Sequence, residues 1–100
     1  MLRIQRHEVN AHTVTLVLQG RIVEAWADFL ERECDESIRS GFRVELDFSG
    51  VIFIGRSGFE ALSRMSRRGV GIVGCSPLLA VMLEQEGIVA VNRQRTPNQS

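Results

Sequence analysis

The chain has 100 residues, of which 44% are hydrophobic and 24% are charged, and its twelve basic and twelve acidic residues give a formal net charge of zero. This length predicts one domain with a single core. The charge balance argues against nucleic acid as a partner, because phosphate binding needs a net basic surface. Every basic residue is an arginine, which excludes chemistry that depends on lysine.

No run of the sequence reaches the roughly 18 apolar residues of a membrane span, and the first residues lack the apolar core of a signal peptide. Cys34 and Cys75 lie far apart and have no partner histidines, so we predict no metal site and no cofactor. The simplest interpretation is two buried thiols in a cytoplasmic protein, and a disulfide is the alternative.

The first half of the chain predicts two strands, a helix and a third strand. Residues 2–6 alternate between apolar and polar, and residues 13–18 are β-rich and close enough to pair with them as a hairpin. Residues 24–40 have helical spacing, with Gly41 as the stop. Residues 44–48 form the next apolar run, which stops at Ser49 and Gly50. The apolar stripe that should face the sheet is Val23, Ala27, Leu30, Cys34 and Ile38.

The second half begins with a short apolar run, residues 51–54, that breaks at Gly55. Helical spacing then continues to Gly69, and residues 70–74 predict a fourth strand. Ser76 and Pro77 open a third helix as cap and first helical residue, and Gly87 closes it. Residues 88–91 predict a short last strand, and residues 93–100 a frayed polar tail.

The order β-β-α-β-α-β-α-β predicts a single α/β domain over residues 1–92. Strands that are separated by helices pair in parallel, so we expect a mixed, mostly parallel sheet with helices packed on it. Strands that are apolar throughout should be buried on at least one face.

Ser57 is the residue that this order makes most interesting, because it stands at a helix start just past a buried strand. A helix start carries free N–H groups and positive dipole charge, so a hydroxyl there is either a cap or a site for a phosphate. Ser57 and Glu60 match the S-x-x-E capping box. Two interpretations stay open and are compatible: Ser57 is a cap, or it is a phosphoacceptor or contact residue.

The stretch LDFSGVIFIGRSGF, residues 46–59, resembles the L-D-x-S-x-V-x-F-I-D-S-S-G-L pattern of the STAS domain, which is found in bacterial anti-sigma factor antagonists. Residues 18–20, 72–77 and 83–88 also look like parts of that family, and the similarity extends over residues 2–91. The resemblance implies a STAS-like fold and a protein that binds other proteins without being an enzyme. It implies an anti-sigma factor or serine kinase as partner, and thereby transcription regulation.

The resemblance also implies that the motif's last serine, Ser57, is a phosphorylation candidate. The candidate contacts with a partner are Gly55, Arg56, Ser57, Gly58, Phe59, Glu60 and Leu62. The chain departs from the pattern at three positions. Gly55 replaces the motif's aspartate, Arg56 replaces the serine after it, and Val23 stands where many members have an aspartate after the second strand. Arg56 is free to pair with a phosphate or with an acidic partner.

The same resemblance supports a second interpretation, a small cytoplasmic STAS subunit that contacts the ATPase of a membrane lipid transporter. A homodimer is also possible. A serine hydrolase is disfavoured, because Phe59 replaces the last glycine of G-x-S-x-G and both His7 and His12 precede the serine. Asp47 as the phosphoacceptor of a receiver domain is disfavoured too, because that chemistry needs a lysine and further carboxylates.

Two surface features have more than one interpretation. Trp26, Phe29 and Ile22 lie off the main apolar stripe, so either the sheet edge or the tail covers them, or they form an exposed patch for a partner. Residues 24–39 are rich in acids and residues 56–68 in arginines. Solvated helix faces explain this, but the charges can also orient a partner, drive self-association or contact lipid headgroups.

Overall fold

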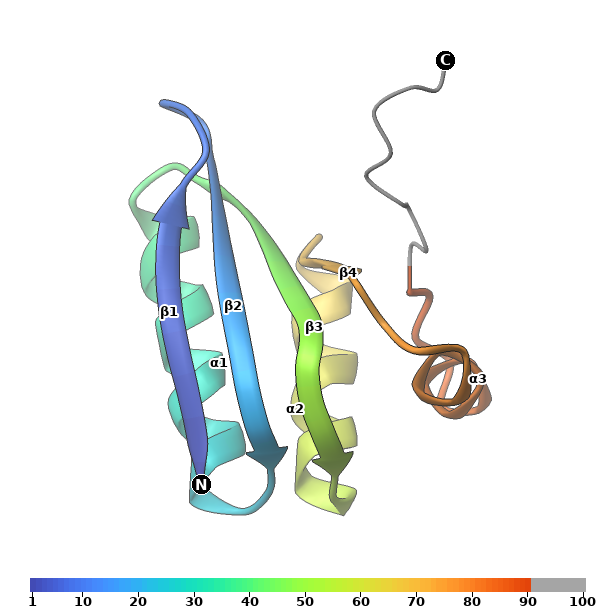
Figure 1. Cartoon of the computed structure of the whole chain (residues 1–100). Helices are drawn as coiled ribbons and strands as arrows, with labels where there is room; N and C mark the ends of the chain where they lie inside the picture. The colour runs from blue at the N-terminus through green and yellow to red at the C-terminus, as the bar shows by residue number, and fades with distance from the viewer. Residues whose placement is uncertain (91–100) are drawn as a thin grey trace.

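Alternation of apolar and polar residues gives the sheet one covered face and one open face. The computed structural model describes residues 1–90. Its strands are β1 (Leu2–Glu8), β2 (Thr13–Ile22), β3 (Arg43–Ile54) and β4 (Gly71–Val73), in the spatial order β1-β2-β3-β4. Its helices are α1 (Ala25–Arg39), α2 (Arg56–Arg67) and α3 (Pro77–Gln85). Helices α1 and α2 cover one face of the sheet, and α3 lies beyond β4 (Figure 1).

The pairing of the strands confirms the predicted mixed sheet in a single α/β domain. Strands β1 and β2 pair antiparallel, whereas β2–β3 and β3–β4 pair in parallel. The side chains that point toward α1 and α2 are buried, and they include Val14, Leu16 and Leu18 of β2 and Val44, Leu46 and Phe48 of β3. Between them, residues such as Thr15 and Glu45 face the other side and stay half-buried or exposed. The strands are therefore buried on one face.

The third strand is longer than the sequence pattern predicts. The two apolar runs 44–48 and 51–54 form one strand, and Ser49 and Gly50 lie inside it. The register against β2 shifts between Val17 and Gln19, which is typical of a β-bulge. Gly50 permits this close pairing, because a Cβ on it would lie 2.8 Å from the Leu18 carbonyl oxygen. The glycine that looked like a strand end is a site of close backbone approach.

The predicted last strand is wrong over residues 88–90, which pair with no other strand. Ile88 instead completes the end of α3: its N–H donates to the Leu83 carbonyl at 2.9 Å, and the Gly87 N–H donates to Glu84 at 3.0 Å. This is a Schellman motif, which commonly includes an apolar contact such as the one between buried Ile88 and Leu83. Val91 and the predicted tail, residues 93–100, lie outside the described residues.

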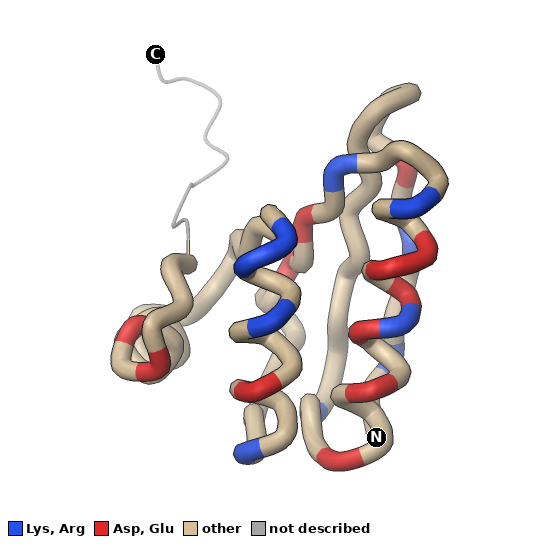
Figure 2. Tube along the Cα trace, turned by 180° about the vertical axis from the view of Figure 1, so that it is seen from behind, with Lys and Arg blue, Asp and Glu red and all other residues tan. Residues whose placement is uncertain are grey.

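The acidic and basic segments face each other within the chain. Helices α1 and α2 lie side by side, and Figure 2 shows acidic residues along α1 and basic residues along α2. Arg64 donates two hydrogen bonds to Glu31, at 2.9 and 3.0 Å, and Arg68 donates to Glu31 and Asp35, both at 3.1 Å. The hydrogen bond from Arg64 lowers the pKa of Glu31. Part of the charge asymmetry is thus used in joining the two helices, which leaves fewer free arginines for a headgroup.

Replacing Glu31 by glutamine should lower the free energy of unfolding by about 1 kcal/mol at pH 7, because the side chain joins two arginines. The lowered pKa means that this contribution is present above the ordinary glutamate value of 4.5 and is lost as the pH falls toward the lower folded value. Urea unfolding of the natural chain and of Glu31→Gln between pH 7 and pH 3 measures this contribution. Glu33→Gln is the control, and an equal, pH-independent loss in both variants would contradict the prediction.

Candidate functional site

Two loops meet where the parallel strands β2 and β3 end, a position at which α/β sheets commonly form sites. The Gly55 N–H donates to the Ile22 carbonyl at 3.0 Å, and the Glu24 N–H donates to Ser57 Oγ at 2.7 Å. We call this place the corner: residues 22–24 at the end of β2 and residues 55–58 after β3. The structure therefore puts the predicted segment 55–58 beside a turn that the sequence analysis did not associate with it.

The capping-box interpretation of Ser57 is wrong. The N-cap of α2 is Gly55, which makes no side-chain cap hydrogen bond, so Ser57 is already the second helical residue. Ser57 as a whole is half-buried, and its hydroxyl accepts a hydrogen bond from the Glu24 N–H on the neighbouring turn. The helix begins at Arg56, one residue before the predicted start at Ser57, so that only Gly55 separates it from β3. The predicted cap of α3 is confirmed, since Ser76 Oγ accepts from the Leu79 N–H at 3.2 Å.

The candidate contact residues divide into exposed and buried ones. Arg56 and Glu60 are exposed, and Gly55 and Ser57 are half-buried. The other three, Gly58, Phe59 and Leu62, are buried. Leu62 has 0% exposure, so it cannot touch a partner without unfolding part of the domain. The prediction that these three residues contact a partner is therefore wrong, and they are packing residues.

Arg56 already has a partner within the chain. Its two terminal nitrogens donate to the Glu86 carboxylate, both at 3.2 Å, which links the start of α2 to the end of α3. The guanidinium group also lies 5.9 Å from the centre of the Phe59 ring. A phosphate or an acidic partner at this position would have to compete with Glu86.

Two of the three departures from the STAS pattern are neighbours in space. A Cβ placed on Gly55 would lie 3.1 Å from Val23 Cγ1. The two positions at which the STAS pattern has aspartates thus contact each other. In this chain one of them is the apolar Val23, and the other is Gly55, which has no side chain. Val23 and Gly55 therefore bring no carboxylate to the corner, and the acidic side chain of the β2–α1 turn belongs to Glu24.

Exposed apolar residues lie beside the corner: Trp26 belongs to the patch that the sequence predicted, in which Ile22 is instead buried, whereas Ile52 and Phe53 were not selected. Ile52, Phe53 and Trp26 are large apolar side chains with exposures of 69%, 47% and 37%. Ile52 is skipped in the register between β2 and β3, and a bulge of this kind turns a side chain outward. Trp26 packs edge-on against Phe29 with ring centres 6.0 Å apart. The position of Trp26 off the apolar stripe was the available signal for that residue, whereas Ile52 and Phe53 lie in an unbroken apolar run that gives no such signal.

The other candidate groups lie away from the corner. His7 and His12 are exposed near the start of β2, at the opposite end of that strand from Ser57. Cys34 and Cys75 are free and buried, which confirms the two-thiol interpretation, and burial raises the pKa of Cys34 to about 12. Within residues 1–90 no three potential metal ligands come together. None of the helices in that part is long and apolar enough to span a membrane.

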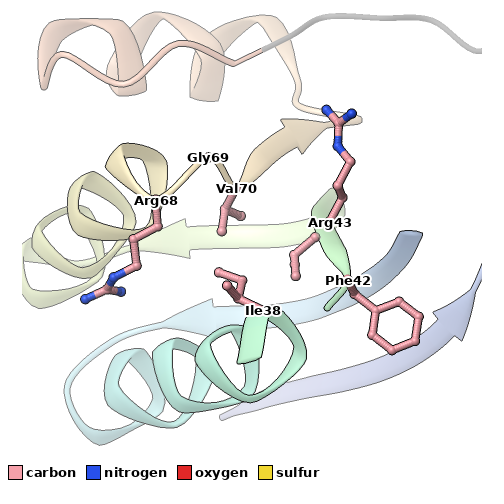
Figure 3. A pocket seen from close by; sticks show the side chains of 7 residues that line it. Ile38, Phe42, Arg43, Arg68, Gly69 and Val70 are labelled. Atoms are coloured by element: carbon pink, nitrogen blue, oxygen red, sulfur yellow. The ribbon is translucent and has the colours of Figure 1, made fainter. Parts of the chain in front are cut away.

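A hollow of about 310 Å³ lies at the end of the sheet where β3 begins. Ile38 of α1 and Val70, after α2, face each other across it, whereas the guanidinium groups of Arg43 and Arg68 point away (Figure 3). It has no convergent polar groups that would orient a ligand, which binding sites normally have. The corner is therefore the stronger candidate site.

Solved structures with this architecture were found. Unphosphorylated SpoIIAA, an anti-sigma factor antagonist, is 17% identical, with a TM-score of 0.72 over 86% of this chain and 82% of that one. The chain has the SpoIIAA-like fold. An anti-sigma factor antagonist from Mycobacterium paratuberculosis is 18% identical, with a TM-score of 0.73 over 87% and 79%. The Bacillus cell fate determinant SpoIIAA in its phosphorylated form is 16% identical, with a TM-score of 0.68 over 86% and 85%.

No protein-family model matches the chain, and no curated protein sequence matches it. The SpoIIAA-like fold confirms the STAS-like fold that the motif predicted. At these identities the similarity establishes the fold, and the role of each corner residue has to be argued from its own geometry.

Glu24 at the corner has backbone angles that a glycine would adopt more easily, with φ +50° and ψ −126°. Glu24→Gly should therefore raise the free energy of unfolding by about 1 kcal/mol, the low end of the cost of such a conformation. Thermal and urea unfolding measure the change. Glu36→Gly, at an exposed position inside α1, is the control and should be destabilised by about 1 kcal/mol. A loss of stability in Glu24→Gly would contradict the prediction.

Proposed function

We propose that the chain is a non-catalytic regulatory domain of a bacterial cytoplasm that binds another protein through the corner. The observation that carries this is the position of Ser57. It lies at the surface at the start of α2, between the exposed residues Glu24 and Arg56, in a fold whose solved examples include anti-sigma factor antagonists. The proposed partner is an anti-sigma factor or a serine kinase, so the output is transcription regulation.

The surface around Ser57 suits a protein partner. Trp26, Ile52 and Phe53 offer apolar area next to polar groups, and aromatic side chains are frequent anchors at interfaces. A phosphate on Ser57 would add a charge of about −1.5 to −2 there and change what a partner meets. SpoIIAA is known in an unphosphorylated and a phosphorylated form, which supports the same control here.

The second candidate function is that of a small subunit of a membrane lipid transporter that contacts its ATPase. The apolar pair Val23–Gly55 favours it, because this pair removes the acidic groups that the STAS pattern places around the serine. In this case the corner would still bind a protein, but without control by phosphorylation. A homodimer is a further prediction, which sedimentation of the purified chain tests.

Affinity purification of the tagged chain from its own cells, followed by mass spectrometry, tests these proposals. We expect an anti-sigma factor or kinase with the natural chain and much less of it with Ser57→Asp. Ser63→Asp is the matched control, because Ser63 is another half-buried serine of α2. Recovery of a transporter ATPase would favour the second function. Equal recovery with Ser57→Asp would contradict control at Ser57, and a phosphate found on that residue would support it.

A further inference from the structure

We propose that Ser57 is a positioning residue for the turn between β2 and α1, residues 23–26. In this inference its hydroxyl holds Glu24 in an unfavourable backbone conformation and thereby fixes Trp26. The presence of a free hydroxyl on Ser57, able to accept from Glu24, would then set the shape of the apolar surface beside it. This goes beyond the proposed function, because it concerns how one face of the domain is built and holds without any partner.

The turn is closed by one backbone hydrogen bond, and its first central residue has the angles of a type II′ β-turn. The Trp26 N–H donates to the Val23 carbonyl at 2.9 Å, which closes the turn, and Glu24 occupies its first central position with φ +50° and ψ −126°. That position strongly favours glycine, because a side chain there is strained. Among residues 1–90, Glu24 is the one non-glycine residue with a positive φ. Something outside the turn has to keep it there.

The Ser57 hydroxyl supplies this constraint. The Glu24 N–H donates to Ser57 Oγ at 2.7 Å across 33 positions of the chain. The acceptor itself is firmly placed, because Gly55 is hydrogen-bonded to Ile22 and Gly58 packs against the Ile22 carbonyl oxygen. The free energy that one hydrogen bond contributes is comparable to the free-energy cost of one strained backbone conformation. Loss of the acceptor is therefore enough to let Glu24 relax.

Relaxation of Glu24 would move Trp26, whose N–H closes the turn. The indole ring packs edge-on against Phe29 and is 37% exposed, so its surroundings depend on where the turn places it. The corner thus connects Ser57 to an exposed aromatic residue through a single backbone group.

Trp26 is the only tryptophan of the chain, so its fluorescence reports on the turn directly. We expect Ser57→Ala to shift the emission maximum to longer wavelength and to increase quenching by acrylamide. Ser57→Thr keeps a hydroxyl and should retain the natural spectrum, and so should the control Ser63→Ala. Circular dichroism checks that each variant is folded. An unchanged spectrum in folded Ser57→Ala would overturn the proposal.

The same change in a Glu24→Gly chain provides the decisive comparison. Glycine adopts the turn without strain, so Ser57→Ala should there leave the emission of Trp26 unchanged. An equal shift in both backgrounds would overturn the proposal, because the effect would not pass through Glu24. If Ser57→Ala folds only in the Glu24→Gly background, this also supports it, and failure to fold in both overturns it. The measurement uses the isolated chain, so its outcome is independent of whether a partner is found.

Discussion

Replacing Leu62 by alanine is expected to lower the free energy of unfolding by about 3 kcal/mol, within the range for a buried leucine that leaves a cavity. Leu62 has 0% exposure and is one of the buried residues of α2. A domain of this size has only about 5–15 kcal/mol of stability, so the loss should lower the unfolding midpoint strongly. Urea unfolding followed by circular dichroism measures it.

The matched control for Leu62→Ala is Glu60→Ala, an exposed position of the same helix. Surface substitutions of this kind usually change stability by less than about 0.5 kcal/mol. The pair of variants also tests whether Leu62 is a packing residue or a contact residue. If Leu62 were a contact residue rather than a core residue, its replacement would weaken partner binding and leave the isolated chain as stable as before.

Replacing Gly58 by alanine should destabilise the chain by about 2 kcal/mol, typical of overpacking. Inside a helix this change normally stabilises, by up to about 1 kcal/mol, so the sign of the effect is diagnostic. A Cβ on Gly58 would collide with the Ile22 carbonyl oxygen and lie 2.9 Å from Ile54 Cγ2. Helix α2 would have to move away from the end of β2, and Ser57 would move with it.

Thermal unfolding of Gly58→Ala measures the loss, and the fluorescence of Trp26 shows whether the corner has shifted. Gly71→Ala is the control, because a Cβ there would meet only Glu45 Cγ, at an ordinary 3.9 Å. A Gly58→Ala chain that is as stable as the natural one would mean that α2 is less tightly held against the corner than the contacts indicate.

Most of the fold could be predicted from the sequence, because the deciding signals are local. The spacing of Ala27, Leu30 and Cys34 indicated α1 and its buried stripe, and Ser76 with Pro77 marked the start of α3. The failures arose where a local pattern has two physical causes. The apolar run after Gly87 predicts a strand, but Ile88 is the apolar residue of a helix end. Gly50 predicts a break between two strands, but it permits close strand pairing.

The site was less predictable, because its chemistry depends on residues far apart in the chain. The motif located Ser57, and the spacing of Ser57 and Glu60 then suggested a cap. Only the fold shows that Glu24 is the donor to its hydroxyl. The link between Arg56 and Glu86 and the contact between Val23 and Gly55 have no sequence signal of their own. Composition did indicate the charge asymmetry of α1 and α2, but not that these charges pair with each other.

The position of β2 at the centre of the sheet has a consequence for the order of folding. Its antiparallel neighbour β1 is reached through a short loop, whereas its parallel neighbour β3 is reached only through the whole of α1. A hairpin forms in about 1–10 μs, but a pairing across a long crossover must first overcome the entropy of closing that loop. We therefore expect docking of β3 on β2, rather than assembly of the hairpin, to limit the rate at which the corner comes into being.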